Sequence, residues 1–456
     1  MGIKNRGGSP DGARRSIARR TWRWTALPLL LAGLAACGFP RPPDLAGGDA
    51  GPPAGDAATG CARDPDCSSP TPFCLDTACV ACRDSASCPA ARPVCDLTGH
   101  DCRTCVQDDE CDSGACDLAA GACVDQGAIL YASPSGGSTD PCSKTSPCSL
   151  LRASGLVDTN TPYIVLQPGR YSGGAMFDGK KVTIAGHNAV LDIVATVSLI
   201  NIINSSMVNM RDTNLEDHLD TSVFDNIPPG IRALDSSLTV DNMQGSTVGI
   251  NAIALTSSRL PLGTLTVGHS HFTGPALFGP QLIIDSCVFH NLAVNSLSND
   301  SISVEGSIQI TNSILIVDTT NRPTFDVRFP TAPQTSQITH NTFVGGSGIA
   351  CSTSAGSSWS FDSNIFYNVP TIATESGCQY QYSLSVPVTG LAGTGNITGD
   401  PMFKDATHGD FHLKPGSPAI NAANPGDVYT GHDFDGTPRP QDGRSDIGAF
   451  EYVARP

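Results

Sequence analysis

The densest group of side chains that could do acid–base chemistry lies between residues 211 and 220. It consists of Arg211, Asp212, Glu216, Asp217, His218 and Asp220. Elimination from a uronic acid sugar needs a basic side chain to remove a proton, and a cation such as Ca²⁺, held by carboxylates, to neutralise the sugar. Arg211, Glu216, Asp217 and His218 are therefore the catalytic candidates. The simpler interpretation, which we favour, is a solvated polar insertion between strands. If these side chains line a groove and a basic residue faces them across it, the catalytic interpretation would be favoured.

Other side chains are spaced less favourably for catalysis. A glycoside hydrolase needs two neighbouring carboxylates, but Asp241, Asp285 and Asp362 are scattered among Gly, Thr and Ser. His269 and His340 occupy equivalent places in a repeated pattern, three turns apart, so at about 4.8 Å per turn they lie about 14 Å apart and cannot share an ion. No Ser-His-Asp order, P-loop or glycine-rich nucleotide motif is visible. These side chains therefore indicate no metal ligand set, and Ca²⁺ is the only cofactor that the catalytic hypothesis would need.

Twelve of the 18 cysteines form three groups of four between residues 61 and 123. The groups are Cys61, Cys67, Cys74, Cys79, then Cys82, Cys88, Cys95, Cys102, then Cys105, Cys111, Cys116, Cys123. Each group opens with a C-x5-C spacing, and the groups begin at nearly equal intervals along the chain, which makes them an internal repeat. So few large apolar residues cannot stabilise a fold alone. We expect disulfides within each group, in any of three connectivities, and a location outside the cytoplasm.

Zinc is the alternative for this Cys-rich segment. Cys79 and Cys82 form a C-x2-C pair, and Cys102 and Cys105 form a second one farther along the chain. The distance between the two pairs in the sequence suits a zinc ribbon. A zinc ribbon would leave the other eight cysteines of the repeat unexplained, so we favour disulfides.

The cysteines beyond residue 125 are sparse. Cys142 and Cys148 are spaced to close a short loop, and Cys351 and Cys378 lie about one turn of the repeated pattern apart, as a disulfide between adjacent loops would require. Cys287 is expected to be an inert, buried thiol.

The N-terminus has the features of an export signal. The segment before Thr25 is rich in arginine, and an apolar run from Thr25 to Ala36 follows. The run is too short to span a bilayer, which needs about 20 residues. Its end, Leu34-Ala35-Ala36-Cys37, resembles the lipobox of bacterial lipoproteins. The resemblance implies a signal peptide over residues 1–36, a lipid on Cys37, and attachment to the cell envelope, with Gly38 favouring the outer membrane or cell surface. The alternative is an ordinary cleaved signal with an incidental cysteine.

Composition limits the partners. Residues 37–60 are rich in Gly, Pro and Ala and are expected to form a tether. Residues 1–36 contain seven of the 27 Lys and Arg residues and one of the 43 Asp and Glu residues, so the rest carries a formal charge of −22. A surface this acidic disfavours binding of nucleic acid, which needs a basic face. It also repels polyuronate chains unless cations bridge the two.

A short pattern with apolar ends recurs in the second half of the chain. It spans Val267–Phe272, Ile284–Phe289, Ile310–Leu315, Ile338–Phe343 and Phe361–Phe366, and its copies start at unequal intervals. Strands that keep register while loops vary in length are typical of a solenoid. Asn341 and Asn364 lie at equivalent places, where we expect a left-handed turn and amide hydrogen bonds from turn to turn.

This pattern resembles the pectate-lyase-like superfamily of right-handed parallel β-helices. The resemblance covers residues 129–456, after Cys-rich repeats over 61–125, and implies an all-β single-stranded solenoid over 129–398. Its entry would be a strand at 131–137 and a short covering helix, with Ser146 as N-cap and Pro147 in the first turn.

Residues 399–456 resemble the C-terminal closing region of bacterial surface β-helix proteins described as choice-of-anchor Q domains. The resemblance rests on Asp400-Pro401-Met402-Phe403, Gly416-Ser417-Pro418-Ala419-Ile420-Asn421 and Asp446-Ile447-Gly448-Ala449-Phe450-Glu451. It implies an exported protein and no particular reaction. Asp433-Phe434-Asp435-Gly436 could suggest a calcium loop, but Pro438 and Arg444 stand where an EF-hand needs Gly and Glu, so we favour turn-forming aspartates.

Two functional hypotheses follow. The first is a lipid-anchored envelope protein whose β-helix binds a polysaccharide or acts as a structural and adhesive element, with the Cys-rich repeats as a stalk. The second is a calcium-dependent polysaccharide lyase or glycoside hydrolase. We lean towards the first, because the sequence shows no clear reactive centre.

Overall fold

The computed structural model describes most of the chain beyond residue 59. The described ranges are 60–193, 198–217, 229–246, 253–256, 263–273, 277–279, 281–290, 302–304, 307–318, 325–328, 335–352, 358–372, 377–426 and 431–454. The expected signal peptide, Cys37, nearly all of the tether and His218 lie outside these ranges. Among the described residues no helix has the length and apolar character needed to cross a membrane.

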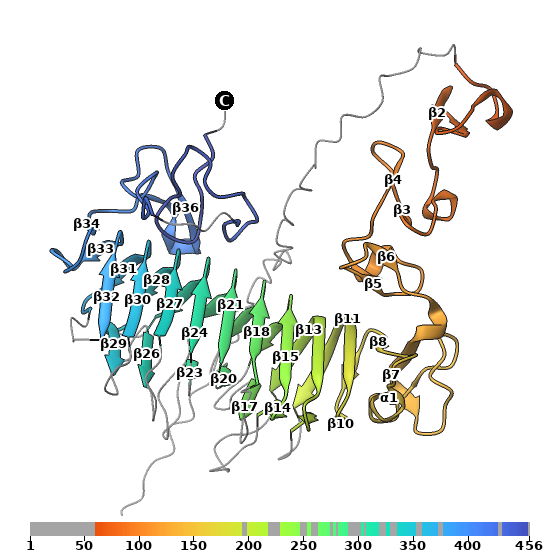
Figure 1. Cartoon of the computed structure of the whole chain (residues 1–456), viewed down its shortest axis with the longest axis horizontal. Helices are drawn as coiled ribbons and strands as arrows, with labels where there is room; N and C mark the ends of the chain where they lie inside the picture. Colours follow the sequence, from red (N-terminus) through yellow and green to blue (C-terminus); the bar gives the residue numbers. More distant parts are fainter. Residues whose placement is uncertain are drawn as a thin grey trace, which may run out of the picture. The chain divides into compact units, whose positions relative to one another are not determined.

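The described residues from Ile129 to Thr398 form a right-handed parallel β-helix with three sheets (Figure 1). We call the first the groove sheet. Its strands are β7 (Ile129–Gly137), β8 (Tyr163–Leu166), the first parts of β11 (Lys181–Ile193) and β13 (Met207–Asp217), β15 (Ser237–Asp241), β18 (Leu265–Gly268), β21 (Leu282–Asp285), β24 (Ile308–Thr311), β27 (Thr335–Thr339), β30 (Ser358–Asp362) and β32 (Cys378–Gln381). Every pair of neighbours in it is parallel, as successive coils of a solenoid require.

The second sheet follows a sharp bend. It contains β9 (Arg170–Tyr171), the second parts of β11 and β13, β16 (Gln244–Ser246), β19 (His271–Thr273), β22 (Val288–His290), β25 (Ile314–Val317), β28 (Thr342–Gly345), β31 (Ile365–Val369), β33 (Leu384–Pro387) and β34 (Ile397–Thr398). The third sheet contains β10 (Ala175–Asp178), β12 (Ile200–Ile203), β14 (Ile231–Leu234), β17 (Ile253–Thr256), β20 (Leu277–Gly279) and β23 (Ile302–Val304), and β26 (Phe325–Arg328) pairs separately with β29 (Ile349–Ser352).

The strand register confirms the repeated pattern. The first residues of all five copies are partners on neighbouring strands, from Val267 through Ile284, Ile310 and Ile338 to Phe361. The last residues are partners as well, from Phe272 to Phe366. These side chains are buried and stack along the axis, so the core is a set of parallel columns.

The bend between the first two sheets departs from one expectation. The left-handed backbone conformation falls on His269, Ser286, Asn312, His340 and Ser363, one residue before the position at which we expected it. Asn341 and Asn364 are instead fully buried, because their amides must point inward to reach the backbone of adjacent coils. The Asn364 Nδ2 donates to the Ile338 carbonyl at 2.7 Å, and the Asn341 Nδ2 donates to the Ile310 carbonyl at 2.8 Å, which confirms the predicted bonding between coils.

The N-terminal end is covered as expected, with a shifted helix start. The Cys142–Cys148 disulfide forms, and the short helix α1 (Leu150–Leu156) follows it. Its N-cap is Ser149, whose side chain accepts from the Arg152 N–H, whereas Ser146 belongs to the preceding turn. Leu150 and Ala153 are buried under the helix.

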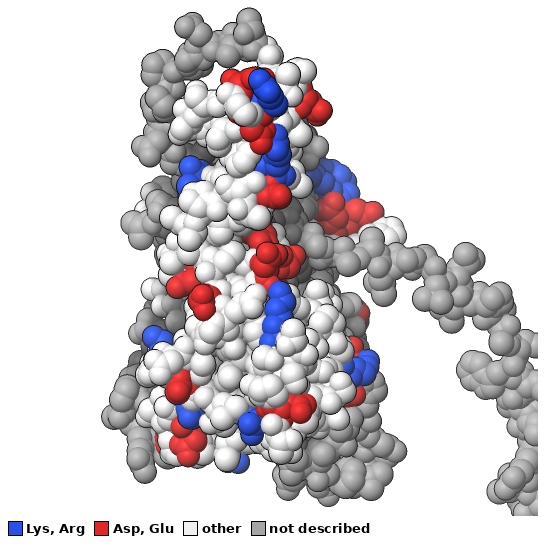
Figure 2. All heavy atoms as spheres, turned by 90° about the vertical axis from the view of Figure 1, so that its right-hand side faces the viewer, with Lys and Arg blue, Asp and Glu red and all other residues white. Residues whose placement is uncertain are grey.

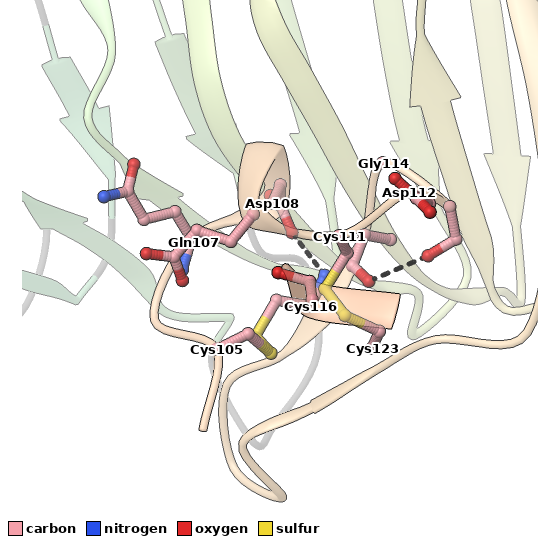
Figure 3. The surroundings of a disulfide bond; sticks show 12 residues. Cys105, Gln107, Asp108, Cys111, Asp112, Gly114, Cys116 and Cys123 are labelled. Atoms are coloured by element: carbon pink, nitrogen blue, oxygen red, sulfur yellow. Dashed lines mark hydrogen bonds between the residues drawn. A yellow bond between two sulfur atoms is a disulfide. The ribbon is translucent and has the colours of Figure 1, made fainter. Parts of the chain in front are cut away.

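The Cys-rich segment consists of three disulfide-bonded hairpins. In each group the first cysteine bonds the third and the second bonds the fourth: Cys61–Cys74, Cys67–Cys79, Cys82–Cys95, Cys88–Cys102, Cys105–Cys116 and Cys111–Cys123. Figure 3 shows the third group. The hairpins are β1 (Phe73–Leu75) with β2 (Ala78–Val80), β3 (Val94–Asp96) with β4 (Asp101–Arg103), and β5 (Cys116–Asp117) with β6 (Ala122–Cys123). A 3-10 turn precedes each: Asp64–Asp66, Ser85–Ser87 and Asp108–Glu110. With all twelve thiols bonded in pairs, no zinc ribbon forms from them.

Two cysteines of the β-helix, Cys287 and Cys378, differ in their bonding. Cys287 is a free, buried thiol, and burial raises its pKa far above the usual range, so it is unreactive. Cys378 is disulfide-bonded. Its expected partner, Cys351, lies in β29, and the structure describes the backbone of that residue without its side chain.

The C-terminal region folds back along the bend of the β-helix. It contains the antiparallel pair β35 (Phe403–Asp405) and β36 (Asp410–Leu413). The Gly448 N–H donates to the Ser363 carbonyl at 2.9 Å, and the Asn424 Nδ2 donates to Asp362 at 2.7 Å. Figure 1 shows this segment, in dark blue, beside the ends of the later strands.

The aspartates of the suspected calcium loop make turn hydrogen bonds. Asp433 Oδ1 accepts from the N–H groups of Asp435 and Thr437, and its Oδ2 accepts from the Glu451 N–H at 2.8 Å. Both carboxylate oxygens are thus engaged by backbone donors, as the turn-forming interpretation expects.

Candidate functional site

A row of uncharged polar side chains runs across the outer face of the groove sheet. Alternation places every second residue of a strand outward, and the register then aligns Thr183, Asn209, Thr239 and Thr266 on four neighbouring strands. On the next two strands the apolar Ile283 interrupts the polar row, and the polar Gln309 follows it. The row therefore offers a hydroxyl or amide group about every 4.8 Å along its first four strands.

The first part of this row lies in a cavity of about 670 Å³. One wall is the tip of the third Cys-rich hairpin, with Asp117, Leu118 and Ala119. The rest of the lining comes from the groove sheet and the bend that follows it, and it includes Tyr163, Lys181, Thr183, Asn209, Thr239, Asp241, Thr266, His269 and Asp285. We call this cavity the groove.

The third Cys-rich repeat is packed against the β-helix, which corrects the expectation that all three repeats form a stalk. The Tyr131 hydroxyl donates to the Ser113 carbonyl at 2.8 Å, and His187 Nε2 lies 2.7 Å from the Gly114 carbonyl. Ala115 joins a buried cluster with Val165 and Ala185, and other members of that cluster are Ile129 and Tyr131. The repeat thus shares a core with the first coils.

Arg211 is held in a buried ion pair and is not in a loop. It lies within β13, so the expected polar insertion is wrong up to residue 217. Its Nη2 is 2.9 Å from Asp108 Oδ1 and 3.1 Å from the Cys116 carbonyl. The side chain of Arg211 is only 13% exposed, and that of Asp108 is 2% exposed. Burial raises the pKa of Asp108, and Arg211 opposes that rise. A guanidinium engaged in this way is not free to act as a base.

The other catalytic candidates do not converge on Arg211. Glu216 lies beyond the bend, in the second sheet, and its Oε2 is 2.5 Å from Arg170 Nη2. Asp217 ends β13, and the structure describes its backbone without its side chain. His218 lies outside the described residues. The structure therefore places Arg211 and Glu216 in two separate ion pairs.

A different group of ionisable residues meets at the far end of the groove. Asp241, Gly268 and Asp285 are partners on successive strands, so the two carboxylates share one column. His269 Nδ1 is 2.8 Å from Asp241 Oδ1, and this hydrogen bond, against the effect of burial, raises the pKa of His269. His432 comes from the C-terminal region, and its Nε2 is 3.6 Å from Asp285 Oδ2.

Sequence reasoning missed this group because loops of unequal length separate its members. Asp241 precedes the five pattern copies, and His432 is far away along the chain. Aligning the buried positions of each strand, instead of counting residues, would have placed Asp241 and Asp285 in one column two strands apart. At the strand spacing of about 4.8 Å their Cα atoms are about 9 to 10 Å apart.

The charges around the groove are mixed. Lys181 contributes a positive charge, Asp117, Asp241 and Asp285 contribute negative ones, and Arg211 is already neutralised by Asp108. Figure 2 shows the neighbouring face, on the side where β7 and α1 lie in Figure 1, with acidic and basic side chains interspersed. The groove thus carries more carboxylates than free cationic groups, which suits an uncharged ligand better than a polyanion.

No protein-family model matches the chain, and no curated protein matches it. Among solved structures, the chain is similar to one described as a crystal structure of pectate lyase Pel9A, with 15% sequence identity and a TM-score of 0.39. That alignment covers 71% of this chain and 96% of the other. The assignment to the parallel β-helix fold rests on the strand pairing given above.

Proposed function

We propose that this protein is an exported lipoprotein whose groove binds an uncharged polysaccharide without cleaving it. The observation that carries the proposal is the row Thr183, Asn209, Thr239 and Thr266, aligned in register inside the groove. A polysaccharide presents a hydroxyl-bearing ring at regular intervals, and a periodic row of hydroxyl and amide groups can bind successive rings.

The walls of the groove support the same ligand class. Leu118 is 48% exposed at the hairpin tip, and Tyr163 lines the same cavity. Apolar and aromatic side chains beside a few polar groups are typical of ligand sites. The apolar faces of sugar rings can pack on these two side chains while their hydroxyl groups bind the polar row.

A lyase is less well supported. Arg211, the basic candidate, is occupied by Asp108, and Glu216 pairs with Arg170 on the other side of the bend. The groove also carries three carboxylates, which repel a uronate chain unless cations bridge them. Calcium-dependent elimination would need a free base, which these two pairs do not provide, so Lys181 would be the basic side chain left for it in the groove.

Binding and cleavage are separable by experiment. The full-length protein is titrated calorimetrically with cellohexaose, xylohexaose, mannohexaose and hexagalacturonate, and each mixture is assayed for new reducing ends and for absorbance near 235 nm. We expect binding of at least one neutral hexasaccharide and no product. Thr239→Lys should abolish that binding. Gln379 is exposed farther along the same sheet, so Gln379→Lys is the control and should leave binding unchanged. Unsaturated products from hexagalacturonate would overturn the proposal.

A glycoside hydrolase is the second candidate, and Asp241 and Asp285 are the residues that favour it. They share one column with Gly268 between them, and the neighbouring His269 is hydrogen-bonded to Asp241. If reducing ends appear in the assay above, Asp241→Asn and Asp285→Asn should each remove them. Activity that survives both substitutions would place the reaction elsewhere.

We propose that a lipid on Cys37 attaches the protein to the cell envelope. Two features support this: the lipobox-like sequence that ends at Cys37, and the disulfide-bonded repeats. Disulfides are expected outside the cytoplasm, and lipid chains on Cys37 together with the tether would keep the β-helix near a membrane. Cells fed an alkyne fatty acid should label the protein, and Cys37→Ser should remove the label. Equal labelling of both proteins would contradict the assignment.

A further inference from the structure

The three Cys-rich repeats share a side-chain hydrogen bond that fixes the third cysteine. The fourth residue of each repeat, Asp64, Ser85 or Asp108, supplies the acceptor. Asp64 Oδ1 accepts from the Cys74 N–H at 2.9 Å, Ser85 Oγ from the Cys95 N–H at 3.2 Å, and Asp108 Oδ1 from the Cys116 N–H at 2.8 Å. Figure 3 shows the bond between Asp108 and Cys116.

In the first and third repeats the same acceptors also bind an arginine. Arg83, from the second repeat, donates to Asp64 Oδ2 at 3.1 Å and to the Cys74 carbonyl at 2.5 Å. Arg211, from β13, donates to Asp108 Oδ1 and to the Cys116 carbonyl. We call this arrangement the arginine clasp. It joins a repeat to the unit that supplies the arginine.

The second repeat lacks a clasp because its fourth residue is a serine. Ser85 caps the Cys95 N–H as the aspartates cap theirs, but it offers no carboxylate to a guanidinium. The second and third repeats are joined by Arg103 and Glu110 instead, whose Nη2 and Oε1 atoms are 2.7 Å apart.

Burial makes the two clasps unequal in strength. The side chains of Arg83 and Asp64 are 39% and 43% exposed, so water screens their attraction. Arg211 and Asp108 are almost enclosed, and removing one member of a buried pair leaves an uncompensated charge. The clasp is therefore a weak link in the first repeat and a strong one between the third repeat and the β-helix.

The third clasp acts on the wall of the groove. Cys116, whose N–H and carbonyl are both engaged in it, begins β5, and Asp117, Leu118 and Ala119 follow directly. These three residues line the groove together with His269 and Asp285. Holding Cys116 thus holds the side chain of Leu118 beside the polar row.

We propose that the third Cys-rich repeat is a ligand-contacting part of the groove, with Leu118 packing on a sugar face and with Asp108 and Arg211 as positioning residues. This proposal rests on the proposed binding of an uncharged polysaccharide. It separates the repeat from the first two, which do not line the groove.

The natural serine of the second repeat provides the test. The variant Asp108→Ser with Arg211→Gln, made in the full-length protein, keeps an acceptor for the Cys116 N–H and removes the clasp. We expect faster hydrogen exchange in residues 116–123 and a Kd for the neutral hexasaccharide weakened about tenfold, which corresponds to about 1.4 kcal/mol. The matched control, Asp64→Ser, removes the exposed clasp of the first repeat and should change neither quantity.

A second variant covers the case in which the double substitution disturbs folding. Leu118→Ala should weaken binding of the neutral hexasaccharide, while hydrogen exchange of residues 116–123 in the unliganded protein stays unchanged. An unaltered Kd in Leu118→Ala and in the double variant, despite faster exchange in the double variant, would overturn the ligand-contacting role. If the unaltered protein binds none of the hexasaccharides, the proposed function and this role both fail. Equal exchange of residues 116–123 in the double variant and in Asp64→Ser would separately overturn the positioning by the clasp.

Discussion

The backbone N–H of Asn341 donates to the side-chain carbonyl of Asn364, 2.8 Å away, on the next coil of the β-helix. The Nδ2 of Asn364 donates a second hydrogen bond between the two coils, to the Ile338 carbonyl. Both amides are fully buried, so no water can replace these bonds. The pair therefore ties adjacent coils at the bend between the first two sheets.

Asn364→Ala should destabilise the protein strongly. It leaves the Asn341 N–H and the Ile338 carbonyl buried without this partner, at about 1–3 kcal/mol for each unsatisfied group. Denaturant unfolding of the variant and of Asn160→Ala, a change in an exposed loop, measures the effect. A loss no larger than that of Asn160→Ala would contradict the structural role of the amide column.

Two glycines should respond to alanine in opposite directions. A Cβ at Gly245 would lie 2.4 Å from the Phe272 ring, so Gly245→Ala should cost about 1–3 kcal/mol through overpacking. Gly155 lies in α1 with nothing within 4 Å of its added Cβ, so Gly155→Ala should stabilise by up to about 1 kcal/mol. Thermal unfolding of both variants tests the pair, and a stabilising Gly245→Ala would show that the column at Phe272 is loosely packed.

Stability should fall as the pH rises from about 4.5 to about 7. Glu451 is buried beside Arg439, and burial raises its pKa from 4.5 to about 7. Between these values the folded state retains a proton that the unfolded state has lost, so the free energy of unfolding decreases with increasing pH. The raised pKa values of Asp433 and Asp446 act in the same direction.

The midpoint of thermal unfolding, measured at several pH values across this window, checks that sign. Glu451→Gln cannot ionise and should flatten the dependence, while its amide oxygen can still accept from Arg439. A midpoint that rises steadily from pH 4.5 to pH 7 would contradict the assignment.

Asp241→Asn should lower the pKa of His269. The hydrogen bond and charge of Asp241 favour the protonated imidazole, although burial opposes it. His269 therefore stabilises the fold below its unfolded pKa near 6.5, and that contribution disappears as the pH rises through the raised folded value. An NMR titration of ¹³C-labelled histidines measures the shift. His271, whose pKa is lowered mainly by burial, should not change and serves as the control.

The β-helix could be predicted from the sequence because inward positions repeat with a fixed chemistry. Val267, Ile284 and Ile310 occupy one column, and their apolar character survives the unequal loops between them. The disulfides within each group of four followed from the spacing of the cysteines. Their connectivity did not, because three pairings satisfy the same spacing.

The groove could not be predicted in the same way. It depends on a contact between Asp108 and Arg211, 103 residues apart, and no local pattern records that a hairpin will pack on β13. Arg211 looked like a candidate base because sequence cannot show that a carboxylate occupies it. The column of Asp241 and Asp285 was hidden because loops of different length precede each aspartate.

A crystal structure of the full-length protein grown with a neutral hexasaccharide tests the central claim most directly. We expect an intact oligosaccharide along Thr183, Asn209, Thr239 and Thr266, with one ring against Leu118 and its far end near His269. A sugar chain bound on another sheet, or one broken between Asp241 and Asp285, would contradict the claim that this groove binds a polysaccharide without cleaving it.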